Sequence, residues 1–201
     1  MSRFTIIFTF IACFMTLFKI KCDGMPQFEM YIKGGNAPMC RAYIIGDFWA
    51  LTTKFCVLNK DVNSLALFNF AGAIFHPVKN MDTTGSKFSH LDIALLKVEK
   101  SMVEQGMVVI SPDMPQEGAQ LYESVKLINT TVISYDNCTK IYGNFSGTFC
   151  STQNSIIQPS SGLFENGMLT GISISYGRVT NSVSAAYVTS WILDTMSEIK
   201  Q

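Results

Sequence analysis

Charge is scarce in this sequence: of 201 residues only 15% are Asp, Glu, Lys or Arg, and the formal net charge is zero. No long run of either sign occurs. Such a chain has no bulk electrostatic attraction for nucleic acid or for an anionic membrane surface, so we expect neither as a partner. Only two histidines are present, which leaves few side chains for a metal centre. We therefore expect no metal and no other cofactor.

Long hydrophobic runs are also few. The run Phe4–Phe18 is short for a membrane-spanning helix, and Arg3 precedes it, which is typical of a secretory signal peptide. We predict a signal peptide over residues 1–22, cleaved near Cys22 or Gly24, with an uncleaved anchor as the alternative. Its removal takes away three of the 15 basic side chains and none of the 15 acidic ones, for a net charge near −3. The mature protein is then expected to be extracellular, away from the membrane.

Cysteine is present in an even number outside that segment. Of six cysteines, two belong to the predicted signal peptide and four remain: Cys40, Cys56, Cys138 and Cys150. An even count in a secreted chain predicts two disulfides, and four cysteines allow three pairings. Metal binding is the weaker alternative, because neither neighbouring pair has the short spacing of metal ligands.

Three glycosylation sequons also suit a secreted protein. They begin at Asn129, Asn137 and Asn144, within sixteen residues of one another. This spacing predicts a glycan-bearing face on the mature protein. For each of the three, the alternative is an unmodified surface asparagine.

The stretch from Cys40 to Cys56 carries the most information. Two apolar runs flank Gly46-Asp47, a pair typical of a hairpin turn, and a cysteine stands at each end. Trp49–Thr53 resembles the Trp-Val-Leu-Thr-Ala-Ala run of the trypsin-like (chymotrypsin-family) serine proteases. The resemblance implies the bridges Cys40–Cys56 and Cys138–Cys150. It also places Phe55 where the family carries its catalytic histidine.

A second resemblance lies at Leu91–Lys97, which is similar to the family's Asp-Ile-Ala-Leu-Leu strand. Asp92 then stands for the aspartate that orients the histidine. An unpaired buried carboxylate is costly, so we expect Asp92 to accept bonds from backbone amides and from the Ser175 hydroxyl. His76, in a His-Pro element, is expected to be structural. His90 shares the strand face of Asp92 but lies too far along it to replace the base.

The nucleophile motif of the family, Gly-Asp-Ser-Gly-Gly-Pro-Leu, has a degraded counterpart at Gln158–Phe164. The resemblance places Ser160 at the nucleophile. Gln158 replaces the glycine whose amide binds the oxyanion, and Pro159 replaces the aspartate that pairs with the freed N-terminal amine. The Ile-Val-Gly-Gly terminus is also missing, because Tyr31–Gly35 lies too close to the first cysteine. We infer that this chain does not use zymogen activation.

The late segment Met168–Gly177 resembles the strand along which the family's peptide substrates pair. Its residues Ser175, Tyr176 and Gly177 are the expected cleft wall, and Asn154 is the expected floor of the specificity pocket. Tyr187-Val188 resembles a last strand, followed by the family's C-terminal helix.

The resemblance implies an all-β fold of two packed six-stranded antiparallel β-barrels with a short C-terminal helix. The N-terminal barrel would span about 26–110, and the C-terminal barrel and helix about 118–199. The function predicted is that of a secreted, catalytically inactive protease homologue that binds or regulates an extracellular protein, such as a protease or an inhibitor. The alternatives are an active serine endopeptidase with an unconventional base and a glycosylated structural protein of secretions.

Overall fold

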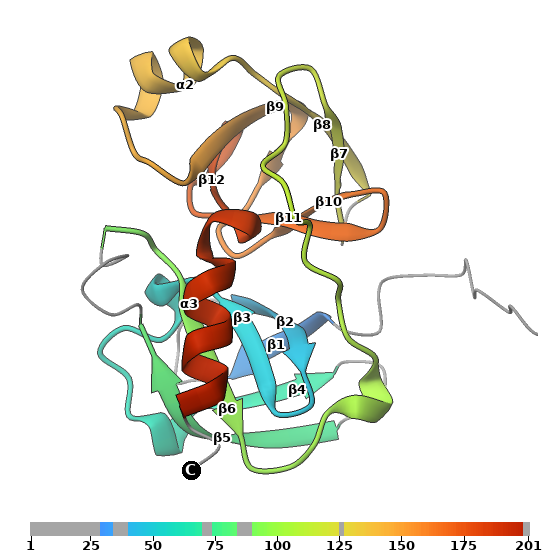
Figure 1. Cartoon of the computed structure of the whole chain (residues 1–201), viewed down its shortest axis with the longest axis vertical. Helices are drawn as coiled ribbons and strands as arrows, with labels where there is room; N and C mark the ends of the chain where they lie inside the picture. Colours follow the sequence, from blue (N-terminus) through green and yellow to red (C-terminus); the bar gives the residue numbers. More distant parts are fainter. Residues whose placement is uncertain (1–28, 34–39, 70–73, 84–89, 125–126, 199–201) are drawn as a thin grey trace, which may run out of the picture.

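The structure is a computed structural model that describes residues 29–33, 40–69, 74–83, 90–124 and 127–198. The predicted signal peptide and its cleavage site lie outside these residues. Twelve strands in the described part form two closed antiparallel barrels of six strands each, as predicted. Figure 1 shows the two barrels one above the other, with the C-terminal helix running down beside the N-terminal barrel.

The N-terminal barrel is closed in the order β1-β2-β3-β6-β5-β4. Its strands are β1 (Glu29–Lys33), β2 (Cys40–Gly46), β3 (Trp49–Thr52), β4 (Ala66–Asn69), β5 (Ile74–Asp82) and β6 (Ala94–Val98). Strands β2 and β3 form the predicted hairpin, although its turn is made by Asp47 and Phe48, one residue later than expected. The barrel interior holds small and aliphatic side chains, among them Ala42, Ile44, Leu67, Ala94 and Leu96.

The C-terminal barrel is closed in the order β10-β11-β12-β9-β8-β7. Its strands are β7 (Gln120–Glu123), β8 (Ile128–Val132), β9 (Thr148–Ile157), β10 (Gly162–Glu165), β11 (Met168–Ser173) and β12 (Gly177–Ser184). Its apolar interior is smaller: Leu121, Val132, Phe149, Ile157 and Leu163. Buried hydroxyls on β9 and β12 complement it, and Ser151 and Thr180 hydrogen-bond to each other at 3.2 Å.

A third core cluster lies between the barrels and includes residues of both, such as Tyr43, Leu95, Phe164 and Val183. Helix α3 (Ala185–Glu198) closes this cluster with its buried face: Ala185, Val188, Trp191, Ile192 and Thr195. This spacing of three or four residues is helical, which explains why Tyr187-Val188 lies in the helix and not in the predicted strand. No helix in the described part has the length and apolar character needed to cross a membrane.

Both disulfides of the predicted pairing are present. Cys40–Cys56 joins the start of β2 to a short 3₁₀ helix, Lys54–Cys56, with 5.8 Å between the Cα atoms. Cys138–Cys150 joins helix α2 (Tyr135–Tyr142) to β9, with a Cα separation of 5.4 Å. The first bridge holds the 3₁₀ helix against the barrel, which places Phe55 next to the segment that leads into β6.

Candidate functional site

The segment Gln158–Gly162, which leads into β10, forms a tight turn. The amide of Ser161 donates to the carbonyl of Gln158 at 3.3 Å, which closes a four-residue turn with Pro159 and Ser160 in its centre. Ser160 has φ = +64°, a left-handed conformation that is uncommon for a residue with a side chain. Proline before a residue with positive φ is the pattern of a type II turn, in which glycine usually takes the third position.

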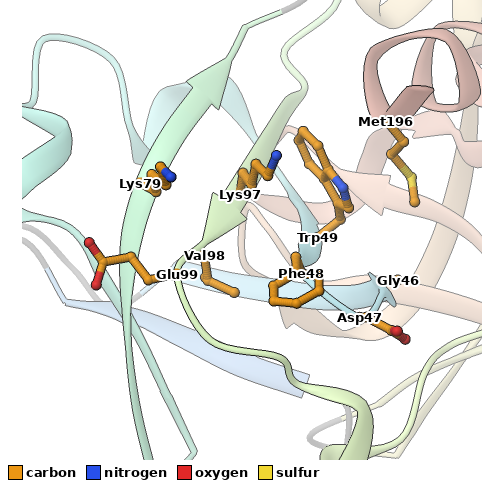
Figure 2. A pocket seen from close by; sticks show the side chains of 9 residues that line it. All are labelled: Gly46, Asp47, Phe48, Trp49, Lys79, Lys97, Val98, Glu99 and Met196. Atoms are coloured by element: carbon orange, nitrogen blue, oxygen red, sulfur yellow. The ribbon is translucent and has the colours of Figure 1, made fainter. Parts of the chain in front are cut away.

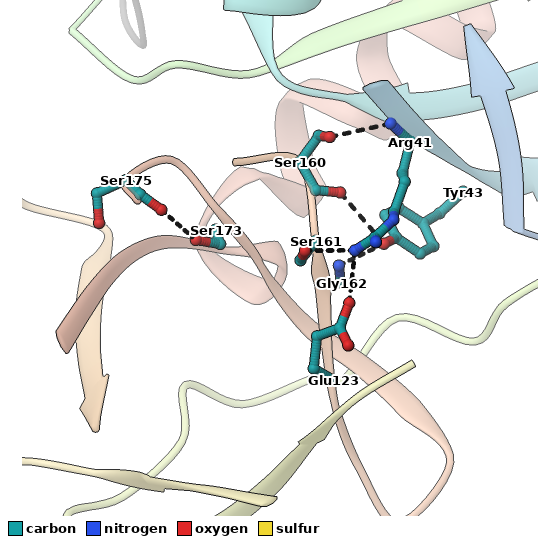
Figure 3. Close-up of polar contacts among 8 residues, drawn as sticks. All are labelled: Arg41, Tyr43, Glu123, Ser160, Ser161, Gly162, Ser173 and Ser175. Carbon is teal, nitrogen blue, oxygen red and sulfur yellow. Dashed lines mark hydrogen bonds and ion pairs between the residues drawn. The ribbon is translucent and has the colours of Figure 1, made fainter. Parts of the chain in front are cut away.

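Arg41 on β2 holds this turn from the other barrel (Figure 3). Its backbone amide donates to Ser160 Oγ at 2.9 Å. Its guanidinium Nη1 donates to Ser161 Oγ and forms an ion pair of 2.5 Å with Glu123 Oε1 on β7. The two charged side chains are only 10% and 2% exposed. A buried charge pair with additional hydrogen bonds therefore connects the two barrels at this turn.

Tyr43, two residues further along β2, adds a second connection. Its hydroxyl accepts from the amide of Gly162 and donates to the carbonyl of Ser160 at 3.2 Å. A Cβ atom on Gly162 would come within 2.6 Å of the tyrosine ring, so only glycine allows this approach. Tyr43 itself is fully buried in the core between the barrels.

Another backbone donor of the turn is bonded to strand β11. The amide of Ser160 donates to the carbonyl of Ser173 on β11 at 2.7 Å, and Ser173 returns a bond to the carbonyl of Ser161 at 2.8 Å. Pro159 has no amide hydrogen. No free N–H group is thus left within Pro159–Ser161, the part of the turn that carries the predicted nucleophile.

Phe55 and Asp92 lie side by side. The backbone amide of Phe55 donates to Asp92 Oδ1 at 2.7 Å, while 59% of the Phe55 side chain remains exposed. Burial raises the pKa of Asp92, and the Phe55 amide and the positive charge of Lys54 oppose this effect. The carboxylate thus accepts a backbone amide, as predicted.

The Ser175 hydroxyl does not complete that arrangement. Ser175 Oγ accepts from the amide of Asn181 at 2.7 Å and donates to the hydroxyl of Tyr142 at 3.3 Å. Tyr142, at the end of α2, in turn donates to the carbonyl of Val179 at 2.7 Å. The expected bond from Ser175 to Asp92 is therefore replaced by one to the α2 tyrosine, because Tyr142 reaches the loop between β11 and β12.

The other predicted cleft residues differ in their exposure and hydrogen bonds. Tyr176 is 65% exposed, and the carbonyl of Gly177 accepts from Gln153 Nε2 at 2.9 Å. Asn154, the predicted pocket floor, is exposed on β9, whereas its neighbour Gln153 is buried. Gln153 also accepts from Thr130 Oγ1 at 3.0 Å, so it has a structural role in the barrel.

No hydrogen bond joins either histidine to Ser160 or Asp92 in the described part of the chain. His90 Nε2 lies 3.4 Å from the carbonyl of Ser146 in the C-terminal barrel. His76 is 5% exposed on β5, and neither ring nitrogen has a hydrogen-bond partner among the described residues. No cluster of three potential metal ligands occurs among the residues that the structure describes.

The three sequon asparagines are all exposed in the C-terminal barrel. Asn129 lies on β8, and Asn137 lies in α2. Asn144 follows α2, and its side-chain oxygen accepts from the hydroxyl of Tyr135 at 2.5 Å. An oligosaccharide is accommodated only at an exposed side chain, so each position satisfies this requirement for modification.

Sequence reasoning missed the residues that hold the turn: Arg41, Tyr43 and Glu123. The only signal for Arg41 and Glu123 was a charged residue inside an otherwise apolar or alternating strand, where a buried charge needs a partner. The partner itself could not be found from the sequence, because the two residues are separated by 82 positions and belong to different barrels.

Comparisons with known proteins agree on the architecture. Neither a family model nor a curated protein matches the sequence. Among solved structures, the scabies mite inactivated protease paralogue S-D1 matches with a TM-score of 0.73 and 14% identity, over 85% of this chain and 92% of that one. Paralogue S-I1 of the same mite has a TM-score of 0.70 and 15% identity, covering 88% and 100% of the two chains.

Proteases with the same fold match equally well. Kallikrein-related peptidase 10 has a TM-score of 0.71 at 16% identity, over 87% of this chain and 98% of that one. Neuropsin from mouse brain has a TM-score of 0.68 at 16% identity, over 85% and 95%. Likenesses at this identity concern the fold alone, and on that basis the chain has the fold of the trypsin-like serine proteases.

Proposed function

We propose that this protein is a secreted, catalytically inactive homologue of the trypsin-like serine proteases that binds or regulates another extracellular protein. The observation that carries the proposal is the pair Phe55 and Asp92. The Asp92 carboxylate accepts the backbone amide of Phe55, and the side chain at that position is a phenyl ring. A phenyl ring cannot take a proton from a serine, and a serine hydroxyl without an adjacent base is a poor nucleophile.

The surroundings of Ser160 support the same proposal. Its side chain is 1% exposed, and its hydroxyl oxygen accepts the amide of Arg41. Attack on a peptide carbonyl requires a serine oxygen that the substrate can reach and a base that takes its proton. Ser160 would have to become exposed before it could act.

The backbone of the turn gives a third argument. Serine proteases stabilise the developing oxyanion with backbone N–H groups that are free to bind it. Here the amide of Ser160, at the nucleophile position, is bonded to the carbonyl of Ser173 and is not free for this role. Two of the structurally similar proteins, S-D1 and S-I1, are themselves described as inactivated protease paralogues. Two disulfides suit an oxidising, extracellular environment.

Activity-based labelling tests the catalytic half of the proposal. The mature protein, purified from a secreting host, is treated with a serine-directed fluorophosphonate probe and assayed against a panel of peptide amides. We expect labelling and turnover no higher than in the Ser160→Ala variant. Labelling that requires Ser160 would show an active hydrolase with an unconventional base.

Affinity purification from the native fluid tests the binding half. The protein is immobilised through its C-terminus, and bound proteins are identified by mass spectrometry with an unrelated glycoprotein as the control. We expect a specific, stoichiometric partner of the protease or inhibitor class. Recovery of the same background proteins on both columns would favour a structural role in the secretion.

A further inference from the structure

The sequon at Asn137 differs from the other two, because its middle residue is a disulfide cysteine. It consists of Asn137, Cys138 and Thr139 and lies in helix α2, where the Asn137 side chain is exposed. Cys138 is 4% exposed and is bridged to Cys150 on β9. Neighbouring residues of a helix do not share a face. The folded protein can therefore carry a glycan on Asn137 while the bridge is closed.

Helix α2 depends on this bridge for its position. It is eight residues long, and its buried residue is Cys138. An isolated helix of that length is unstable in water. Helix α3 is held differently: it buries an apolar face, and near its end the Met196 side chain extends toward Gly46 of the β2–β3 hairpin (Figure 2). The bridge to Cys150 and a hydrogen bond from the Tyr142 hydroxyl to β12 hold α2 instead. Before the bridge forms, we therefore expect the α2 segment to be unfolded.

In the folded helix, the two groups that define the sequon point apart. A sequon combines the asparagine amide, which receives the oligosaccharide, with a hydroxyl two residues later. Residues two apart do not face each other in a helix, whereas in an extended chain they lie on the same side. In α2 the Thr139 hydroxyl also donates to the carbonyl of Asp136 at 3.0 Å. The folded helix thus cannot present the Asn137 amide and the Thr139 hydroxyl together to a transferase.

The spacing of the two cysteines limits the time for which the sequon stays unfolded. Cys150 follows Cys138 by 12 residues, so it is synthesised about one to two seconds later at ~5–20 residues per second. A loop of about ten residues closes within ~10–100 ns, and disulfide formation then takes seconds or longer. The bridge can thus form before the rest of the C-terminal barrel folds. Its formation and the modification of Asn137 fall within the same period.

We propose that Asn137 is glycosylated only before the Cys138–Cys150 bridge closes, so that the two reactions compete and Asn137 is partly occupied. Glycosylation joins Asn137 Nδ2 to the first sugar carbon of a lipid-pyrophosphate-linked oligosaccharide. The amide nitrogen loses a proton, and the lipid pyrophosphate leaves. The bridge forms by exchange with an oxidised disulfide of another protein, which takes up two electrons and two protons from the cysteines. This order of events requires the secretory location of the proposed function.

The variant Cys150→Ser tests the competition, because it prevents the bridge and leaves the sequon unchanged. Cys56→Ser is the matched control: it breaks the other bridge and also leaves one cysteine unpaired. Each protein is expressed in a glycosylating, secreting host and collected from cells and medium together, so a variant that fails to fold is still measured. Peptide N-glycosidase treatment in water enriched in the heavy oxygen isotope labels every asparagine that carried a glycan. Mass spectrometry then gives the occupied fraction at Asn137 and at Asn129.

In the wild-type protein, Asn137 should be occupied to a clearly lower fraction than Asn129, which lies outside the bridged loop. Cys150→Ser should raise the occupied fraction of Asn137 about twofold or more, because the sequon then stays unfolded for longer. Cys56→Ser should leave that fraction unchanged. Dithiothreitol added to cells that express the wild-type protein should act like Cys150→Ser, without any substitution.

Three results would overturn the competition between bridge and glycan: full occupancy of Asn137 in the wild-type protein, an equal rise in both variants, or no glycan on Asn137 in Cys150→Ser. The amount of protein in the medium reports secretion separately. Wild-type protein that reaches the medium without responding to Cys150→Ser would therefore contradict this inference alone. Wild-type protein that never leaves the cytosol would also contradict the secretory location.

Discussion

At the scale of single residues, His76 is a titratable side chain in a buried site that disfavours its charged form. It lies almost fully buried on β5, and neither ring nitrogen has a hydrogen-bond partner within the described chain. Burial lowers the pKa of His76 below its ordinary value of 6.5, because the charged form loses its hydration, and the positive charge of Lys100 acts in the same direction while the nearby Lys100 backbone opposes it. The imidazole is therefore held in its neutral form at neutral pH.

This depressed pKa predicts a loss of stability in mild acid. Above pH 6.5 both folded and unfolded states carry a neutral His76, so the group has no effect there. As the pH falls from 6.5 through the lower folded-state pKa, the unfolded chain binds a proton more readily, and the free energy of unfolding decreases. Urea midpoints measured between pH 7.5 and 5 should show this fall.

His76→Phe should flatten that pH dependence, because phenylalanine fills the site and does not titrate. The control is His90→Gln, which removes the other histidine at an exposed position. In this control, the change of the urea midpoint with pH should be the same as in the wild-type protein. An unchanged slope in His76→Phe would assign the acid sensitivity to carboxylates instead.

At the scale of elements, the turn Gln158–Ser161 determines what the candidate site can do. Its central Ser160 combines two opposing features: a left-handed backbone that favours glycine, and a hydroxyl that satisfies the amide of Arg41. Substitutions at Ser160 can separate the effect of its backbone conformation on stability from the effect of its hydrogen bond.

Ser160→Ala should destabilise the protein by about 1–3 kcal/mol, because it leaves the buried amide of Arg41 without an acceptor. Ser160→Gly loses the same hydrogen bond but relieves the left-handed strain, which is worth about 1–2 kcal/mol for a residue with a side chain. The glycine variant should therefore be the more stable of the two in urea unfolding. The reverse order would mean that the turn changes its conformation when the hydroxyl is removed.

Some structural elements could be predicted from the sequence and others could not. The β2–β3 hairpin was predictable, because turn residues and apolar runs are local patterns, whereas the pairing of the cysteines followed from the resemblance to the protease family. The start of α3 was missed, because Ala185–Val188 has a short apolar pattern that suits a strand or a helix. The contacts of Arg41 were missed because they are formed only when the two barrels pack.

The whole molecule is two barrels joined by the core between them and by the Arg41–Glu123 pair. Removing one partner of a buried ion pair is strongly destabilising, so Glu123→Leu and Arg41→Met should each cost about 3–5 kcal/mol. The double variant Arg41→Met/Glu123→Leu should recover much of that loss, since apolar replacements of a buried pair are often tolerated. Additive losses across this cycle, measured by urea unfolding with the disulfides intact, would argue against a direct interaction.

The last prediction concerns the repair of the site as a whole. Phe55→His places an imidazole beside Asp92, whose carboxylate already accepts the backbone amide at that position. The formal set of Ser160, histidine and Asp92 would then be complete. We nevertheless expect no detectable amidase activity, because the base corrects only one of the defects of the site.

The defects that remain belong to the turn and to the contacts between the barrels. Ser160 stays buried with its hydroxyl on the Arg41 amide, and its own amide stays bonded to the carbonyl of Ser173. Loss of a single oxyanion donor alone costs a protease about 10²–10³-fold in turnover. The assay compares Phe55→His with Phe55→His/Ser160→Ala against peptide amides and a fluorophosphonate probe. Turnover that depends on Ser160 would contradict the prediction and make Phe55 the sole cause of inactivity.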